Sequence, residues 1–180
     1  MTDKDYSLVA YTAVDGIPTF TDSFIMGLFD RVQDEGLFQS LFYDGETKTA
    51  NDFLSMFKFG SNQLFVLVIE KEVAGIVWLN NFEVRRAEFH FCFFKNLRGK
   101  RSFEIGKKVV LELLNMEANG KPMFDLLTGL TPENNRAARL WCKKLGFKTL
   151  GAIPSAVYDH YQSGKSIPGI VSYVERGVYG

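Results

Sequence analysis

The segment FFKNLRGKRSFEIGKK, residues 93–108, combines clustered basic side chains with a glycine-containing loop, which suits a phosphate or pyrophosphate site. Its charge is strongly positive, whereas the whole chain has 21 basic and 21 acidic residues. A helix is predicted to begin inside it, and a helix N-terminus with added cations favours a phosphate or pyrophosphate. The alternative is a solvated basic turn, because short charge clusters are common on surfaces. The cations are Lys95, Arg98, Lys100, Arg101, Lys107 and Lys108.

Glu88 and His90 precede this segment and form a carboxylate–imidazole pair suited to proton transfer. Residues i and i+2 of a strand share one face and lie roughly 7 Å apart, so a water molecule could link the two groups. The alternative is structural. Glu88 would then pair with Arg85 or Arg86, and His90 would be a satisfied, partly buried histidine.

The composition restricts the class of protein. A chain of 180 residues with 46% apolar residues and 17 phenylalanines is expected to fold as a single domain, residues 1–180. Its net charge of zero argues against nucleic-acid binding by general electrostatics. No apolar stretch approaches about 18 residues, so no membrane span is expected. The N-terminus has no signal-peptide pattern, which favours a cytoplasmic protein.

The cysteines and glycines exclude other kinds of site. Cys92 and Cys142 fall in a predicted strand and a predicted helix, so we expect no disulfide framework. The chain has two histidines and no Cys-x-x-Cys motif, so no metal is expected. Gly99 and Gly106 have the wrong spacing for a P-loop, and the dinucleotide fingerprint G-x-G-x-x-G is absent.

Hydrophobic periodicity and turn residues predict the elements that position these groups. In the first half we expect a strand at 6–12, a helix capped by Thr21 or Asp22 and ended by Gly36, a loop at 37–48, a helix capped by Thr49 and Asp52, an antiparallel hairpin turning at Lys71, and a strand at 85–94.

In the second half, Ser102 is expected to cap a helix that Asn119-Gly120 and Pro122 end, with Gly106 packing that helix on the sheet. We then expect a strand at 126–131, a helix from Thr131-Pro132 to Leu145, and strands at 148–153 and 170–176 joined by a 16-residue polar loop. The predicted fold is a mixed α/β (α+β) sheet of six or seven mostly antiparallel strands. It has one parallel β-α-β crossover and helices on both faces.

Two motifs resemble the GCN5-related N-acetyltransferases (GNAT). NNRAARLWCKKLGF, residues 134–147, resembles the family signature Asn-x-x-Ala…Leu-Gly-Phe, and residues 93–101 resemble the acetyl-coenzyme A loop Arg/Gln-x-x-Gly-x-Gly/Ala. The predicted order of elements agrees with the family along nearly the whole chain. Arg101 and Phe103 stand where the family has small residues. Some phage-borne members are similar in this respect, which suggests a phage or prophage source.

The resemblance implies an acetyltransferase that moves an acetyl group from acetyl-CoA to a primary amine by direct attack in a ternary complex. It implies that backbone groups of two aromatic residues bind the pantetheine arm and that the loop binds the pyrophosphate. It also places the signature asparagine at the cofactor. Carried to this chain, the cofactor residues are Phe93, Phe94, Arg98, Gly99, Lys100, Arg101, Ser102 and Asn135.

The same resemblance leaves the acid–base chemistry open. Glu88 or His90 would deprotonate the amine. The family's thiolate-protonating tyrosine lies seven positions after the signature asparagine, where this chain has Cys142. Cys142 is either the acid or a small buried apolar side chain. Tyr158 and Tyr161, in the predicted loop, are substitutes, and catalysis by positioning alone is a further alternative.

The acceptor is expected to be a small-molecule or protein amine, with no nucleic acid and no membrane as partners. A homodimer is compatible with the resemblance. The alternative function is a non-catalytic GNAT-like domain that senses CoA or binds a partner, and Arg101, Phe103 and Cys142 favour it. In the family an aromatic region flanks the acceptor pocket, and it corresponds here to Phe38, Phe42, Tyr43, Phe53, Phe57 and Phe59.

Overall fold

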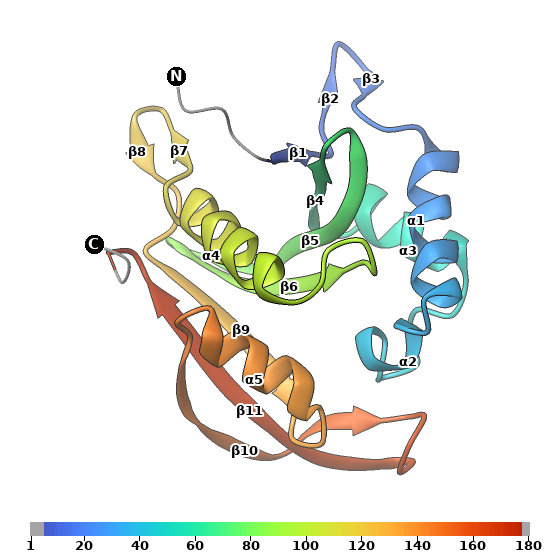
Figure 1. Ribbon diagram of the computed structural model, residues 1–180, viewed down its shortest axis with the longest axis vertical. Coiled ribbons are helices and arrows are strands. Elements are labelled where there is room, and N and C mark those ends of the chain that lie inside the picture. The colour runs from blue at the N-terminus through green and yellow to red at the C-terminus, as the bar shows by residue number, and fades with distance from the viewer. Residues whose placement is uncertain (1–5, 178–180) are drawn as a thin grey trace. The chain divides into compact units, whose positions relative to one another are not determined.

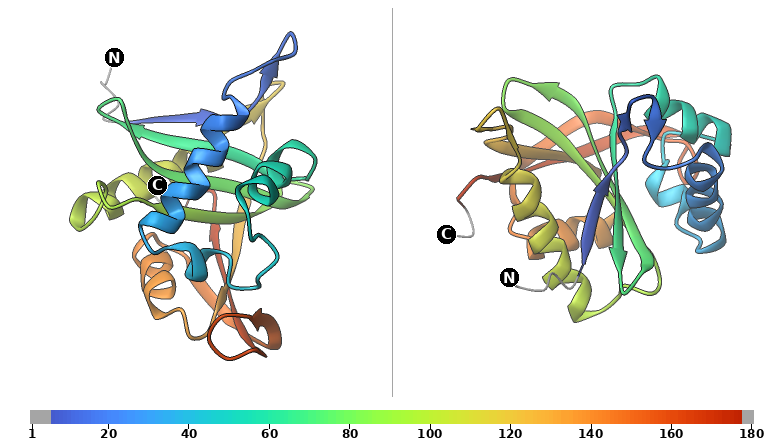
Figure 2. Two further views of the ribbon diagram at one scale, coloured as in Figure 1. Left: turned by 90° about the vertical axis from the view of Figure 1, so that its right-hand side faces the viewer. Right: turned by 90° about the horizontal axis from the view of Figure 1, so that it is seen from above.

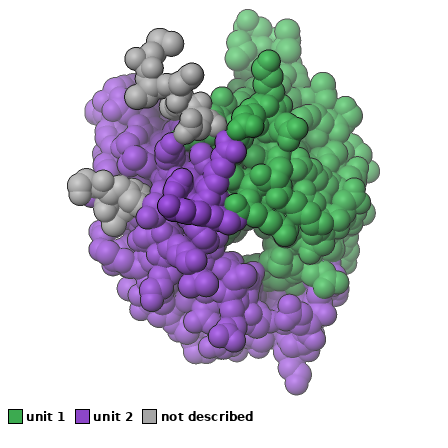
Figure 3. All heavy atoms as spheres, in the orientation of Figure 1, with its two compact units in different colours: residues 1–79, 90–98 green, residues 80–89, 99–180 purple. Residues whose placement is uncertain are grey.

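A computed structural model describes residues 6–177, which divide into two compact units (Figure 3). Of the described residues, unit 1 comprises 6–79 and 90–98, and unit 2 comprises 80–89 and 99–177. The chain passes between the units within β5 (Glu72–Glu83), after residue 79, and within β6 (Arg86–Phe93), after residue 89. It passes again at the Arg98–Gly99 bond.

Seven strands form one sheet in the order β1-β4-β5-β6-β9-β11-β10. Strands β6 and β9 pair in parallel, and the pairs β1–β4, β4–β5, β9–β11 and β10–β11 are antiparallel. The predicted mixed sheet with one parallel crossover is thereby confirmed. The strands are β1 Ser7–Ala10, β4 Gln63–Ile69, β5 Glu72–Glu83, β6 Arg86–Phe93, β9 Leu126–Pro132, β10 Lys148–Asp159 and β11 Lys165–Glu175.

Three helices of unit 1, α1 (Asp22–Asp34), α2 (Phe38–Leu41) and α3 (Ala50–Lys58), gather on one side of β4 and β5 (Figure 2). Thr21 caps α1 through the Phe24 N–H, and Thr49 caps α3 in a complete capping box, as predicted. Between helices and strands lies an aromatic core. Its buried rings are Phe29, Phe42, Phe53, Phe57, Trp78 and Phe94.

The described helices of unit 2, α4 (Lys100–Leu114) and α5 (Arg136–Lys144), lie side by side over its strands (Figure 1). A Cβ added to Gly106 of α4 would meet Trp141 of α5 and Leu145, the C-cap residue of α5, at 2.8 Å. The prediction that Gly106 packs the helix on the sheet is therefore wrong. It allows close contact between two helices instead. No helix among residues 6–177 is long and apolar enough to cross a membrane.

Two short hairpins were not predicted. Strands β2 (Ala13–Val14) and β3 (Ile17–Pro18) turn at Asp15-Gly16, and β7 (Glu117–Ala118) and β8 (Lys121–Pro122) turn at Asn119-Gly120. All four turn residues have positive φ, as the Asp-Gly and Asn-Gly type I′ signals demand. Asn119-Gly120 thus turns a hairpin and does not end α4, which stops at Leu114.

Two other segments differ from the expectation. The predicted loop at 37–48 contains α2, a single turn whose Phe38 and Leu41 pack partly on the unit 1 core. Helix α5 begins at Arg136 and not at Pro132, because Pro132 ends β9 opposite Gly169 of β11. In both places tertiary contacts decide which structure the segment adopts. A single helical turn such as α2 is too short to show a hydrophobic period in the sequence.

The predicted 16-residue loop, residues 154–169, is a loop only at 160–164, because β10 and β11 extend through the rest of it as one hairpin. Strand β10 is the edge of the sheet, and its residues are exposed except Val157 and Asp159. Its register shifts between Ile153 and Val157, around Ser155 with φ 53°. An edge strand exposed on both faces needs no apolar alternation, so its sequence is similar to that of a loop.

Candidate functional site

The end of β6 leads into the basic segment through a tight turn in unit 1. Phe94 is fully buried, and its N–H donates to the Ala74 carbonyl at 2.9 Å. The Leu97 N–H closes the turn on the Phe94 carbonyl, also at 2.9 Å, and Leu97 is buried. Lys95 and Arg98 are exposed on this turn. Two buried side chains therefore anchor a turn that presents cations to solvent.

Helix α4 begins in unit 2 directly after this turn, with Gly99 as its N-cap residue. Gly99 has φ 72° and ψ −147°, a region that residues with a side chain rarely adopt. Within the described chain no side chain caps this end. Ser102 is buried, and its hydroxyl donates to the Gly99 carbonyl at 2.7 Å, so the prediction that Ser102 is the N-cap is wrong. A glycine here leaves the first N–H groups of the helix uncovered by a cap side chain.

Lys100 and Arg101 are exposed in the first turn of α4, where they add positive charge to the helix terminus. Phe103 is half-buried, and its ring centroid lies 6.4 Å from that of Trp141 in α5. The Lys144 ammonium lies 4.2 Å from the Phe103 ring centroid. The bulky residue in the family's small-residue position thus packs on α5.

Glu88 of β6 lies in unit 2, half-buried, and its carboxylate accepts a hydrogen bond from the Asn81 amide at 2.8 Å. Arg85 forms its ion pair with Asp125, and Arg86 forms one with Glu83 at 2.6 Å. Asn81 was not among the residues found by sequence analysis. The one sign in the sequence is a polar residue near the end of an apolar strand. In the structure this residue has φ 47°, which is uncommon for a residue other than glycine.

His90 lies in unit 1, where its ring stacks on Trp78 with centroids 4.8 Å apart and planes 3° from parallel. Trp78 is buried in the aromatic core next to Phe42 and Phe57. His90 itself is half-buried. The imidazole is therefore held in a fixed plane while part of its surface stays accessible.

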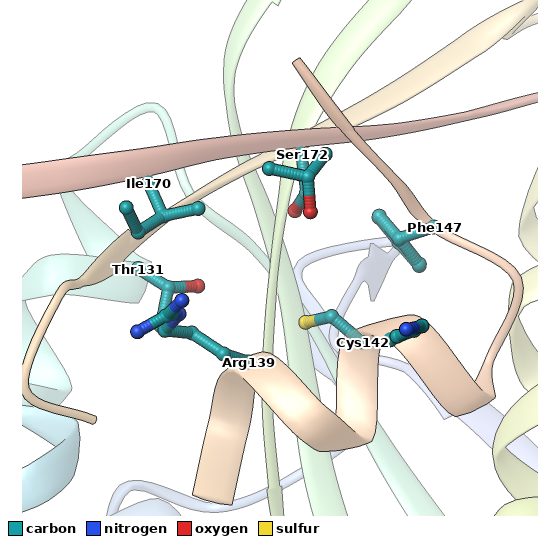
Figure 4. Close-up of a pocket in the computed structure, with 8 residues that line it drawn as sticks. Thr131, Arg139, Cys142, Phe147, Ile170 and Ser172 are labelled. Carbon is teal, nitrogen blue, oxygen red and sulfur yellow. The ribbon is translucent and has the colours of Figure 1, made fainter. Parts of the chain in front are cut away.

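Cys142 points from α5 into a small pocket of unit 2 (Figure 4). It is 8% exposed, and burial raises the pKa of its thiol to about 11. Ser172 lines the same pocket, and among the described residues its buried hydroxyl has no hydrogen-bond partner. The full lining is Thr131, Arg139, Cys142, Lys143, Phe147, Thr149, Ile170 and Ser172.

Asn135 caps α5, with its side-chain oxygen accepting the Ala138 N–H at 3.1 Å. Its neighbour Asn134 donates to the buried Asp159 carboxylate at the end of β10, at 3.0 Å. Sequence analysis missed this bond because a single aspartate in a polar segment carries no signal. The bond ties the tip of the β10–β11 hairpin to the start of α5.

Tyr158 is on β10, opposite Ser166, and not on a loop as predicted. Its side chain is 48% exposed, and its ring lies 6.3 Å from that of His160. Tyr161 packs edge-on against His160 at 4.7 Å. The two tyrosines thus share one histidine at the hairpin tip.

The residues of the expected acceptor region divide by burial. Phe42, Phe53 and Phe57 are core residues of unit 1, whereas Phe59 is 85% exposed. Phe38 and Tyr43 are half-buried. Between residues 6 and 177 no group of three His, Cys, Asp or Glu side chains could hold a metal ion.

No protein-family model matches this sequence, and no curated protein matches it significantly. Solved structures, however, share its fold along nearly the whole chain. The ribosomal L7/L12 α-N-protein acetyltransferase RimL, in complex with coenzyme A, is 12% identical over 98% of this chain and 97% of its own, with a TM-score of 0.69. The microcin C7 self-immunity acetyltransferase MccE, in complex with acetyl-CoA and AMP, is 14% identical over 96% and 93%, with a TM-score of 0.69.

A third example is the spermidine N-acetyltransferase of Vibrio cholerae in complex with CoA and spermine. It is 16% identical over 98% of this chain and 99% of its own, with a TM-score of 0.67. At these identities the likeness concerns the architecture. The seven-stranded sheet, with β6 and β9 as its parallel pair, is the GNAT fold.

Proposed function

We propose that this chain, as one acyltransferase domain of residues 1–180, transfers the acetyl group of acetyl-CoA to a primary amine. The amine attacks the thioester directly in a ternary complex. The observation that carries the proposal is the start of α4, where a glycine in a left-handed conformation opens a helix without a capping side chain, directly after a basic turn. It stands on a fold shared with acetyltransferases whose structures contain CoA or acetyl-CoA.

In this proposal the N–H groups of Lys100, Arg101 and Ser102 bind the pyrophosphate. Arg98 and the two exposed cations of the first turn add charge, and Gly99 lets the cofactor approach the backbone. The backbones of Phe93 and Phe94 bind the pantetheine arm, and Asn135 contributes indirectly as the cap of α5.

Glu88 and His90 are the proposed general bases. An alkyl amine is mostly protonated at neutral pH, so a base must take its proton before or during attack. Asn81 orients the Glu88 carboxylate, and Trp78 orients the His90 ring. Two orienting partners for two acid–base groups on one strand support a catalytic use of that strand.

The proton for the departing thiolate is assigned to Tyr158 in preference to Cys142. A thiol whose pKa is about 11 and which is 8% exposed is poorly matched to proton donation at neutral pH. Tyr158 is half-exposed and can reach solvent or substrate. If neither Tyr158 nor Cys142 donates a proton, the alignment of amine and thioester lowers the activation barrier by itself.

The acceptor is an amine, either on a protein N-terminus or on a small molecule such as a polyamine, the classes named for the structures of similar fold. The first experiment is thermal unfolding with and without acetyl-CoA. At about 100 times its dissociation constant, a ligand of the folded state adds about 2.7 kcal/mol. Release of CoA thiol is then measured with an α-amino peptide and with spermidine. No thermal shift at millimolar acetyl-CoA contradicts the proposal.

A second candidate function is a non-catalytic GNAT-like domain that senses CoA or binds a partner. The observation that favours it is the burial of Cys142, which stands where the family has its acid. This candidate predicts no amine-dependent release of thiol, with a thermal shift by acetyl-CoA if the domain senses CoA and none if it only binds a partner. Release of CoA thiol by the wild-type protein with either amine excludes the non-catalytic function.

A further inference from the structure

We infer that Arg31 and Glu35 of α1, which we call the α1 brace, are positioning residues for the proposed cofactor loop. The inference rests on the proposed function, and it concerns how the loop keeps the shape that binding requires. The two residues lie one helical turn apart at the C-terminal end of α1. The Arg31 guanidinium donates a hydrogen bond to the Glu35 carboxylate at 3.0 Å. Helical spacing alone would make them an ordinary surface pair. Their other contacts show that they are more than that.

Glu35 holds the turn after β6 through its backbone. Its second carboxylate oxygen accepts the N–H of Lys95, 60 positions away in the chain. The Glu35 side chain is only 11% exposed, so this charge-assisted bond is shielded from solvent. A carboxylate placed there fixes the first residue of the basic turn.

Arg31 holds the same turn through three further contacts. Its guanidinium donates to the Val73 carbonyl at 2.7 Å and to the Asn96 side-chain oxygen at 3.2 Å, and its central carbon lies 4.0 Å from the Phe94 ring centroid. Asn96 donates to the same Val73 carbonyl at 3.0 Å. One planar side chain thus joins β5, the buried Phe94 and the turn, which is the kind of contact that arginine makes and lysine does not.

The brace therefore binds each residue from 94 to 96, directly before Arg98 and Gly99. Lys95 and Arg98 are exposed on a turn whose backbone the brace holds at residues 94–96. Without the brace the turn would sample other conformations. If the competent fraction fell to about one tenth, the apparent dissociation constant of acetyl-CoA would rise about tenfold.

The test compares Arg31→Ala, Arg31→Lys, Glu35→Ala and Glu35→Gln in the full chain. Acetyl-CoA affinity is measured by calorimetry, and the KM for acetyl-CoA is compared with kcat. We expect Arg31→Ala, Arg31→Lys and Glu35→Ala to weaken binding about tenfold and raise KM, with kcat at saturating donor nearly unchanged. Glu35→Gln keeps an oxygen for the Lys95 N–H and should bind nearly as wild type.

Hydrogen exchange supplies a readout that does not depend on activity. In Glu35→Ala the Lys95 amide should exchange faster, while the Phe94 amide, bonded to Ala74 within unit 1, should keep its protection. The matched control is Asp22→Asn, which breaks the 2.7 Å ion pair with Lys58 at the other end of the same helix. It should change neither affinity nor exchange at Lys95.

The outcomes separate the two proposals. If wild type does not bind acetyl-CoA, the proposed function is wrong, and the brace has no cofactor to serve. If wild type binds but Arg31→Ala and Glu35→Ala bind as tightly, the function stands and this inference alone is overturned. Loss of Phe94 protection together with Lys95 protection would also overturn it, because the pair would then support the whole strand end and not the turn.

Discussion

Strand β6 is buried differently in its two halves. In unit 2, Ala87 and Phe89 are buried, and Phe89 stacks on Phe147. In unit 1, Cys92 at the strand's end and Phe94 just beyond it are buried, and they belong to the aromatic core under α1 and α3. Because alternate residues point to opposite faces, the buried face changes along one strand.

This difference has a functional consequence. At the change of face, His90 and Phe91 are each half-buried, so neither is wholly core nor wholly surface. A side chain in that setting can be oriented by a packed neighbour and still reach a substrate. The candidate base His90 lies there, stacked on Trp78.

The largest expected effect concerns the bases on the two halves of β6. Glu88→Gln or His90→Gln should lower turnover by about 10²–10⁴-fold, the usual value of general-base help, with acetyl-CoA affinity nearly unchanged. The responsible variant should also lose the acidic limb of the pH–rate profile. Asn81→Ala should give a smaller loss if Glu88 is the base. Wild-type turnover in both single variants and in the double variant would make both residues structural.

The change of buried face predicts unequal costs for neighbouring phenylalanines. Phe94→Ala removes a fully buried ring and should lower the free energy of unfolding by about 3–5 kcal/mol. Phe93→Ala removes a half-buried ring and should cost clearly less. Denaturant unfolding of both variants measures the difference. A larger cost for Phe93→Ala than for Phe94→Ala would contradict the change of buried face along β6.

Two helical glycines, one in each unit, should respond oppositely to alanine. At Gly106 the new methyl group meets Trp141 and Leu145 at 2.8 Å, and overpacking of this kind costs about 1–3 kcal/mol. At Gly27 of α1 nothing lies within 4 Å, so alanine should stabilise by up to ~1 kcal/mol. Thermal unfolding of Gly106→Ala and Gly27→Ala tests this. A stabilised Gly106→Ala variant would refute the close contact of α4 with α5.

The last effect appears only at alkaline pH and concerns the two buried thiols, with no change expected at neutral pH. Burial, and to a lesser degree the Glu35 carboxylate, raises the pKa of Cys92 to about 12, whereas that of Cys142 is about 11. Since an unfolded thiol titrates near ~8.5, the folded state keeps its proton longer, and stability falls as pH rises from there toward each folded pKa. Each thiol contributes at most about 1.4 kcal/mol per pH unit.

Cys92→Ala should therefore flatten the alkaline loss of stability over a wider pH range than Cys142→Ala. The measurement is denaturant unfolding between neutral pH and about pH 12, with both variants compared with wild type at each pH. Identical slopes for all three proteins would show that neither thiol is shielded as described.

Local chemistry alone determined several parts of this protein. Thr21, the Thr49–Asp52 capping box and the turn at Lys71 were predicted correctly because each acts within four residues of chain. The basic segment at the end of β6 and the mixed sheet were also predicted. The phage or prophage source, the homodimer and the cytoplasmic location stay predictions.

Tertiary structure alone decided the rest. Gly99 replaces Ser102 as the start of α4 because the Ser102 hydroxyl is buried and bonds backward. The second half of β10, residues 154–159, was taken for a loop because an edge strand carries no apolar alternation. The bonds from Arg31 and Glu35 to the turn at Lys95 join residues about 60 positions apart. Nothing local in the sequence marks such contacts, because only the packing of α1 beside β5 and β6 brings those atoms within reach.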